Sequence, residues 1–263
     1  MLFDDQAPAF DDRAGVPEHV ARAVADALAE LAGPVDGQRW LEVGAGTGGL
    51  SLPLLRLPIR YTGFDRSAAM LEVFRERVDA AGLAAELRVT DGNARWTADD
   101  ASVDVIFSAR ALHHLDAEHA AVETRRVLAA PGGWLVLGRV RRPPESVKSV
   151  LRRQMRRMLQ AQGFAGRSHE ARAGAVFTAL ERVGGRRIEP RVAARWTAPH
   201  RPADSIASWE GKQGLAGIDV PADVKARVLA NLRAWAAAEF GDVHQPREQE
   251  EAFELDAIRV PIG

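Results

Sequence analysis

A glycine-rich turn is the part of this sequence best suited to holding a ligand. The turn runs from Gly44 to Gly49 and follows a mainly apolar stretch that ends with Leu41-Glu42-Val43. Glycines allow backbone N–H groups to approach a ligand without side chains in the way, above all at the start of a helix. Gly44, Gly46 and Gly49 also satisfy the G-x-G-x-x-G pattern of dinucleotide sites. The turn therefore predicts a nucleotide-like ligand but leaves its class open.

Acidic residues at three positions around the turn help to distinguish a dinucleotide from an adenosine ligand. Glu42 lies two residues before the first glycine, where a dinucleotide fold usually has an apolar residue. Asp65 ends the next predicted strand, and a carboxylate there can accept both hydroxyls of a ribose in either NAD or an adenosine ligand. Asp91-Gly92-Asn93 follows the third predicted strand, where a carboxylate can accept the exocyclic amine of adenine. This combination favours an adenosine ligand over a dinucleotide.

The elements expected to position these residues alternate regularly along the chain. Strands are predicted over 39–43, 61–65, 85–90, 103–108 and 134–139, with helices over 17–32, 50–55, 68–80 and 119–128. Such alternation implies a parallel sheet with helices on both faces, and ligands bind beyond the carboxyl ends of its strands.

The regular alternation of strands and helices ends after residue 139, where Pro143-Pro144 disfavours regular secondary structure. Helices are predicted over 145–162, 171–183, 202–209 and 221–240, and strands over 187–196 and 251–260. We expect one domain over 1–263, in which 34–140 form the cofactor-binding core and 141–250 contain a helical cover with the substrate region.

Composition excludes several classes of site and partner. The chain has 263 residues, a net charge of −1 and no cysteine, so disulfides, zinc–thiolate sites and cysteine nucleophiles are excluded and no metal site is predicted. The near-neutral charge argues against bulk attraction to nucleic acid or membrane. No apolar run is long enough to cross a membrane, and the acidic N-terminus is unlike a secretory signal. We expect a cytoplasmic protein that uses a small molecule or cofactor.

The charge is nevertheless uneven. Ten Arg or Lys residues stand between Arg139 and Arg172, against Glu145 and Glu170 alone, while the C-terminal part is acidic. Two interpretations stay open: these segments are solvated or pair with one another, or the basic helix meets an anionic substrate.

Taken together and in order, these motifs resemble those of class I S-adenosylmethionine-dependent methyltransferases of the broad small-molecule group. The matching stretches are Leu41–Gly49, Phe64–Leu71, Val89–Asn93, Asp104–Leu115 and Val127–Gly138. The resemblance implies an α/β, Rossmann-like doubly wound sheet of seven strands with the last antiparallel. It also implies S-adenosylmethionine as cofactor and S-adenosylhomocysteine as product.

The resemblance further implies a role for individual residues. Those expected near the cofactor are Arg13 at its carboxylate; Gly44, Ala45 and Gly46 at its methionine end; Glu42 supporting that loop; Asp65 at the ribose; Arg66, Met70, Asp91, Gly92 and Asn93 around the adenine; and Ala109 under the sulfonium.

The expected reaction is an in-line displacement of a methyl group, which requires alignment of the reactants and exclusion of water. A general base is needed only when the acceptor must lose a proton, and His113 and His114 are the candidates. One alternative is an RNA methyltransferase that uses the basic 139–172 surface, although Ser108-Ala109-Arg110-Ala111 stands where base-methylating enzymes carry an Asn-Pro-Pro-Tyr type motif. Another is an NAD(P)-dependent oxidoreductase. The sequence leaves the acceptor and the oligomeric state undetermined.

Overall fold

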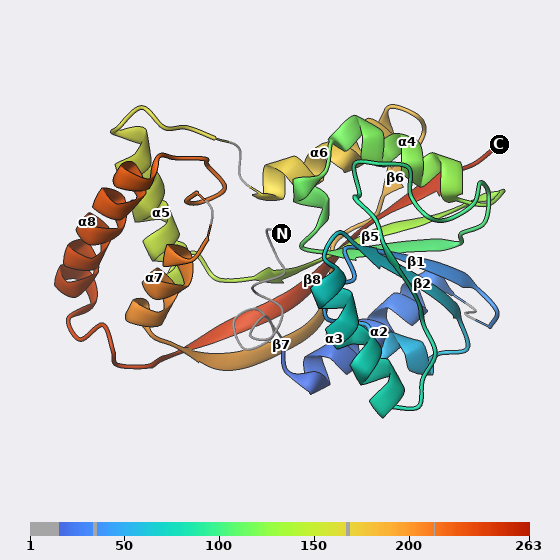
Figure 1. Cartoon of the computed structure of the whole chain (residues 1–263), viewed down its shortest axis with the longest axis horizontal. Helices are drawn as coiled ribbons and strands as arrows, with labels where there is room; N and C mark the ends of the chain where they lie inside the picture. Colours follow the sequence, from blue (N-terminus) through green and yellow to red (C-terminus); the bar gives the residue numbers. More distant parts are fainter. Residues whose placement is uncertain (1–15, 34–35, 167–168, 213) are drawn as a thin grey trace. The chain divides into compact units, whose positions relative to one another are not determined.

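The computed structural model describes residues 16–33, 36–166, 169–212 and 214–263 (Figure 1). The chain divides into two compact units. The first contains the described residues up to Arg139, with Glu170–Ala194 and Phe253–Gly263, and the second contains Val140–His169 and Arg195–Ala252. The predicted cofactor-binding core falls in the first unit.

The first unit is built on a sheet that begins with five parallel strands. They are β1 (Arg39–Val43), β2 (Arg60–Asp65), β3 (Glu86–Val89), β4 (Val105–Ala109) and β5 (Gly132–Arg141). The sheet order is β3-β2-β1-β4-β5-β8-β6, in which β6 (Arg186–Arg187) is antiparallel to β8 (Arg247–Pro261), and β7 (Arg191–His200) also pairs with β8. The predicted α/β class, with a parallel sheet and an antiparallel edge, is confirmed.

Helices cover both faces of this sheet, as Figure 1 shows. The helix α4 (Ala117–Val127) and the helix α6 (His169–Glu181) lie on one face, and α2 (Glu18–Ala32) and α3 (Ala68–Ala80) lie on the other. Side chains alternate between the two faces of the sheet along β2, so this strand packs against both layers of helices. Phe64 packs in the core beneath α4 and α6, whereas Tyr61 packs with Phe74 of α3.

Two predicted elements differ from the structure. The helix expected over 50–55 is wrong: this stretch consists of turns and the short 3-10 helix η2 (Leu54–Arg56). Pro53 lacks the N–H that a helix would use, and the Ser51 hydroxyl is bonded to Glu42 instead. The strand expected over 187–196 is divided into β6 and β7, so eight strands rather than seven are present among the described residues. The division falls at Pro190, which cannot donate to a sheet ladder.

The second unit is a small helical body. The helix α5 (Val147–Gln160) packs with α7 (Pro202–Glu210) and α8 (Ala222–Phe240). The apolar stripe of α5, Val147, Leu151, Met155 and Leu159, is buried in one cluster with Trp209 of α7 and apolar residues of α8, as the spacing of apolar residues predicts.

Within the described ranges, no helix has the length and apolar character that crossing a membrane requires.

Gly48 offers a test of how the glycine turn is packed. Its φ is +76°, and a Cβ added there would lie 2.1 Å from the ring of the fully buried Phe74. Gly48→Ala therefore combines left-handed strain with overpacking, and we expect a loss of about 3 kcal/mol in the free energy of unfolding. Chemical denaturation measures this loss.

Gly82→Ala is the matched control, because Gly82 also has a positive φ, +62°, but nothing lies within 4 Å of its added Cβ. Strain alone predicts a loss of about 1 kcal/mol there. Equal losses in the two variants would contradict the close packing of Phe74 under the turn.

Candidate active site

The glycine turn starts directly at the carboxyl end of β1 and is bound to the neighbouring strand. The backbone N–H groups of Gly44 and Ala45 both donate to the carbonyl of Phe64, at 2.9 and 3.0 Å. Gly44 has φ +78°, and a Cβ there would lie 2.2 Å from the Cβ of Ala111. Glycine is therefore required at this position both by conformation and by the close approach of the segment that follows β4.

Asp65 joins the glycine turn to the start of α3. Its Oδ2 accepts the N–H of Gly46 at 3.0 Å, and its Oδ1 accepts the N–H of Ser67 at 2.9 Å. Ser67 in turn caps α3 by accepting the N–H of Met70 at 3.2 Å. Burial raises the pKa of Asp65, and these backbone N–H groups partly offset the increase. One half-buried carboxylate thus fixes the relative position of two segments that flank the expected ligand.

Glu42 is buried behind the turn in a small polar cluster. Ser51 and Tyr61 donate their hydroxyls to its Oε2 at 2.5 and 2.6 Å. Burial raises the pKa of Glu42 to about 7; the two hydroxyl hydrogen bonds oppose the rise, and the nearby charge of Asp65 adds to it. Glu42 is therefore poised between its neutral and ionised forms near neutral pH.

The segment after β3 contains Asp91 and is held by hydrogen bonds within the loop and to the start of α4. The Asp91 carboxylate accepts the N–H of Asn93 at 3.0 Å, and the Gly92 carbonyl accepts the indole N–H of Trp96 at 2.9 Å. The Asn93 side-chain oxygen accepts the N–H of Asp116 at 2.8 Å, so it positions the start of α4.

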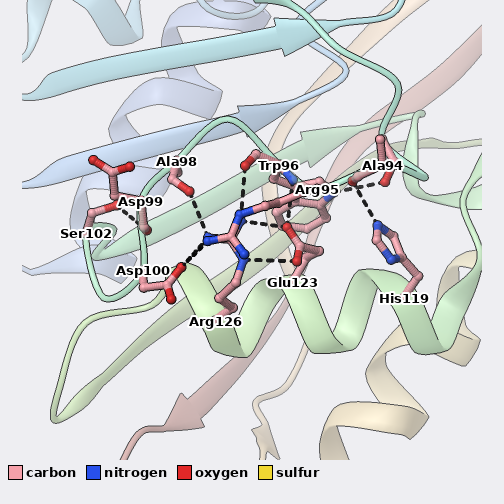
Figure 2. A network of polar contacts seen from close by, with 11 residues as sticks. Ala94, Arg95, Trp96, Ala98, Asp99, Asp100, Ser102, His119, Glu123 and Arg126 are labelled. Atoms are coloured by element: carbon pink, nitrogen blue, oxygen red, sulfur yellow. Dashed lines mark hydrogen bonds and ion pairs between the residues drawn. The ribbon is translucent and has the colours of Figure 1, made fainter.

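A network centred on Arg126 anchors the rest of this segment to α4 (Figure 2). The guanidinium donates to the carbonyls of Trp96 and Ala98 and pairs with Glu123 at 2.6 Å and Asp100 at 2.7 Å. Glu123 also accepts the backbone N–H of Trp96 at 2.7 Å. Although burial opposes its ionisation, the contacts with Arg126 and Trp96 hold the pKa of Glu123 below its usual value. The loop that follows Asp91 is thereby fixed at several points.

The carboxyl end of β4 contains a residue that the sequence did not single out. Arg110 follows Ala109 with φ +62°, a left-handed conformation that is uncommon outside glycine. Such strained positions cluster at functional sites. This conformation brings the next residue, Ala111, against Gly44. Only the short side chains at these two positions hinted at the close approach.

The two predicted histidines lie just beyond this point, in the short 3-10 helix η3 (Leu112–His114). Their rings are 3.9 Å apart. Surrounding protein atoms and the positive charges of Arg172 and Arg66 lower the pKa of His114, while Asp65 opposes the change. A neutral imidazole therefore lies within electrostatic range of Asp65.

Sheet register explains why these residues gather at one edge. Asp65 is level with Val89, and Val43 with Phe64, so the first three strands end together. Of the other predicted residues, Arg66 is exposed and Met70 is buried in α3. Arg13 lies outside the described residues. The described part of the chain contains no group of three His, Cys, Asp or Glu side chains that could hold a metal ion.

Comparison with known families bears directly on this edge of the sheet. Residues 41–133 match the model of the methyltransferase domain family, from the end of β1 to the start of β5. This range includes the glycine turn, Asp65, Asp91 and Ala109. Within the chain, these residues therefore correspond to a methyltransferase domain. The resemblance to S-adenosylmethionine-dependent methyltransferases is supported over residues 41–133.

Curated relatives match over the same region. A protein-L-isoaspartate O-methyltransferase from Methylorubrum populi is 37% identical over 118 residues, which are 43% of this chain and 55% of that protein. A ubiquinone biosynthesis O-methyltransferase from Bordetella avium is 29% identical over 119 residues, 45% of this chain and 49% of that protein. The chain thus spans about half the length of these relatives.

Solved structures resemble the fold over most of the chain. A methyltransferase-like protein from Bacillus halodurans has a TM-score of 0.57 at 16% identity and covers 90% of this chain and 98% of its own. The cyclase SpnF has a TM-score of 0.58 at 17% identity and covers 99% of this chain and 94% of its own. These similarities show the fold alone.

The pKa of Glu42 predicts a pH dependence of stability. A carboxyl that titrates near 7 when folded and near 4.5 when unfolded binds more protons in the folded state between these values. Stability from this group is therefore present at low pH and is lost as pH rises, by at most about 3 kcal/mol.

Glu42→Gln keeps an acceptor for Ser51 and Tyr61 without the charge. Unfolding measured between about pH 5 and pH 8 should show a smaller decline in the variant than in the wild type. Identical slopes would contradict a buried, elevated Glu42.

The Arg126 network predicts which segment depends on α4. Arg126→Met leaves Glu123 buried without its partner, so we expect a loss of about 3–5 kcal/mol in stability. Amide hydrogen exchange should quicken first over residues 94–102, where Arg126 holds two carbonyls. Arg125→Met, at the exposed neighbouring position, is the control and should leave exchange unchanged. Uniform faster exchange throughout the sheet, with none specific to 94–102, would show that the network does not hold this segment.

Proposed function

We propose that this chain is an S-adenosylmethionine-dependent methyltransferase that transfers a methyl group to a small molecule. The observation that carries the proposal is the Asp65 carboxylate at the end of β2, bonded to the glycine turn through Gly46 within a matched methyltransferase domain. The curated relatives named above are O-methyltransferases, so we propose oxygen as the first acceptor atom to test.

The cofactor would lie along the carboxyl edge of β1, β2 and β3. The N–H groups of Gly46 and Ser67 occupy only part of the acceptor capacity of the Asp65 carboxylate, so ribose hydroxyls can still donate to it. The methionine end would lie on Gly44–Gly46, and Glu42 would hold the turn from behind through its contact with Ser51. We assign Ala109 to the sulfonium position.

The adenine would lie between the first turn of α3 and the segment after β3. Asp91 and Gly92 would contact its edge, while Asn93 keeps that segment against α4. Arg66 and Met70 would flank the ring. The Arg126 network matters here because it fixes the loop that carries Asp91.

The reaction places modest chemical demands on these residues. A bound sulfonium would supply an activated methyl group, and its transfer to an acceptor oxygen would leave the electron pair of the broken carbon–sulfur bond on sulfur. The turn and Asp65 would orient the donor so that the three reacting atoms lie in line. A hydroxyl acceptor must also lose its proton, and His114, whose pKa is lowered, is our candidate to receive it.

The assignment of residues 141–250 to substrate recognition, the cytoplasmic location and the role of Arg13 stay predictions. The match across the glycine turn and Asp91 supports the methyltransferase over the NAD(P)-dependent alternative.

Asp65→Asn tests the proposed ribose contact. The amide keeps the size of the side chain but removes the charge and one acceptor, so affinity for S-adenosylhomocysteine should fall at least about tenfold, the loss of one charged hydrogen bond. Asp79→Asn, on the exposed surface of α3, is the control. Isothermal calorimetry measures both affinities, and circular dichroism checks that both variants are folded. Wild-type affinity in folded Asp65→Asn would overturn the ribose assignment.

A further inference from the structure

One face of α5 in the second unit holds several positive charges close together. Lys148, Arg152 and Arg156 recur every four residues, each one position after the buried Val147, Leu151 and Met155. This spacing places them in a row beside the apolar stripe. Arg142, just before the helix, adds a fourth charge, because it acts electrostatically on both Lys148 and Arg152. We refer to Arg142, Lys148, Arg152 and Arg156 as the cationic row.

A single buried carboxylate lies against this row. Glu251 of β8 is 5% exposed, and its Oε1 contacts Arg142 Nε and, at 3.2 Å, His200 Nε2. Although burial opposes ionisation, His200 and Arg142 hold the pKa of Glu251 below its usual value. The charge of Glu251 is therefore directed mainly at Arg142 and His200.

The remaining charges of the row repel one another. Burial and the charges of Arg142, Lys212 and Arg152 lower the pKa of Lys148 to about 8, against a smaller opposing effect of Glu251. Burial and the charges of Arg142 and Arg156 likewise lower the pKa of Arg152. Water still reaches the Arg152 side chain, so an incoming group can reach it as well. Crowded cations in a partly desolvated place are stabilised by a counter-charge.

Arg139, at the start of the basic segment, has acidic partners and helps to define the row by contrast. It pairs with Glu254 at 2.6 Å and with Asp256 at 3.0 Å, within the first unit. Part of the basic segment therefore does pair with the acidic C-terminal part. The α5 row differs, because Arg156 instead donates to the carbonyl of Ala216 at 3.0 Å.

We propose that the cationic row binds the anionic group, a carboxylate or a phosphate ester, of a small molecule. An arginine presents a planar pair of donors to such a group, and a lysine adds a compact charge.

Sulfate is the first probe, because it carries a fixed double charge near neutral pH and needs no cofactor. Calorimetric titration in low-chloride buffer should detect binding to the full chain. Arg152→Met should weaken binding about tenfold or more, as for loss of one charged hydrogen bond. Arg157→Met removes an equal charge from an exposed position of the same helix outside the row, and should change sulfate affinity less than about twofold, an effect of net charge alone. Equal weakening in both variants, or no sulfate binding, would overturn the proposal.

Lys148 supplies a second readout that a general charge effect would not give. The groups that act on it are Arg142, Arg152, Lys212 and Glu251. At about pH 8 it is partly deprotonated, and a bound dianion should raise its pKa, so binding should take up protons. Titration in two buffers of different ionisation enthalpy measures this uptake. Lys148→Met should abolish it, and uptake that persists unchanged in that variant would exclude Lys148 from the site.

Discussion

The site depends on the carboxylate of Asp65 and its hydrogen bonds to the backbone of Gly46 and Ser67. Gly46 belongs to the turn after β1, and Ser67 begins α3, so a single side chain determines how two segments face one another. Neither segment has regular structure of its own at that point. Asp65 can hold them because β2 lies beside β1 in register, which places its last residue next to the turn. A ligand bound to the same carboxylate would therefore meet a surface that is already organised.

Glu42, Asp65 and Asp91 show how the surroundings of a carboxyl group determine its role. Glu42 is buried among hydroxyls, and its pKa rises to about 7, so it is a structural group sensitive to pH. Asp65 is half-buried and held by N–H groups, which oppose the effect of burial on its pKa. Asp91 is exposed, and its carboxylate accepts the N–H of Asn93 in its own loop. In the proposed site, Asp65 and Asp91 would contact the ligand, whereas Glu42 would support the glycine turn from behind.

Much of the first unit could be predicted from the sequence because its signals are local. The strand over 39–43 and the helix over 68–80 have the predicted limits, since Trp40, Leu41 and Val43 make β1 mainly apolar and Ser67 caps α3. The sequence also predicts which acids stand at strand ends. The helix expected over 50–55 fails because tertiary contacts decide that stretch: Ser51 bonds to a glutamate nine residues away. Arg126 donates to the carbonyls of Trp96 and Ala98, far away in the sequence, and the left-handed Arg110 brings Ala111 against Gly44; no local pattern reveals either contact.

The central claim is that the carboxyl edge of this sheet binds an adenosyl-sulfur ligand. Parallel calorimetric titrations of the purified protein with S-adenosylhomocysteine and with NADH test it most directly. The account predicts saturable binding of S-adenosylhomocysteine and none of NADH. Binding of NADH alone would contradict it, because the glycine turn and Asp65 would then form a dinucleotide site.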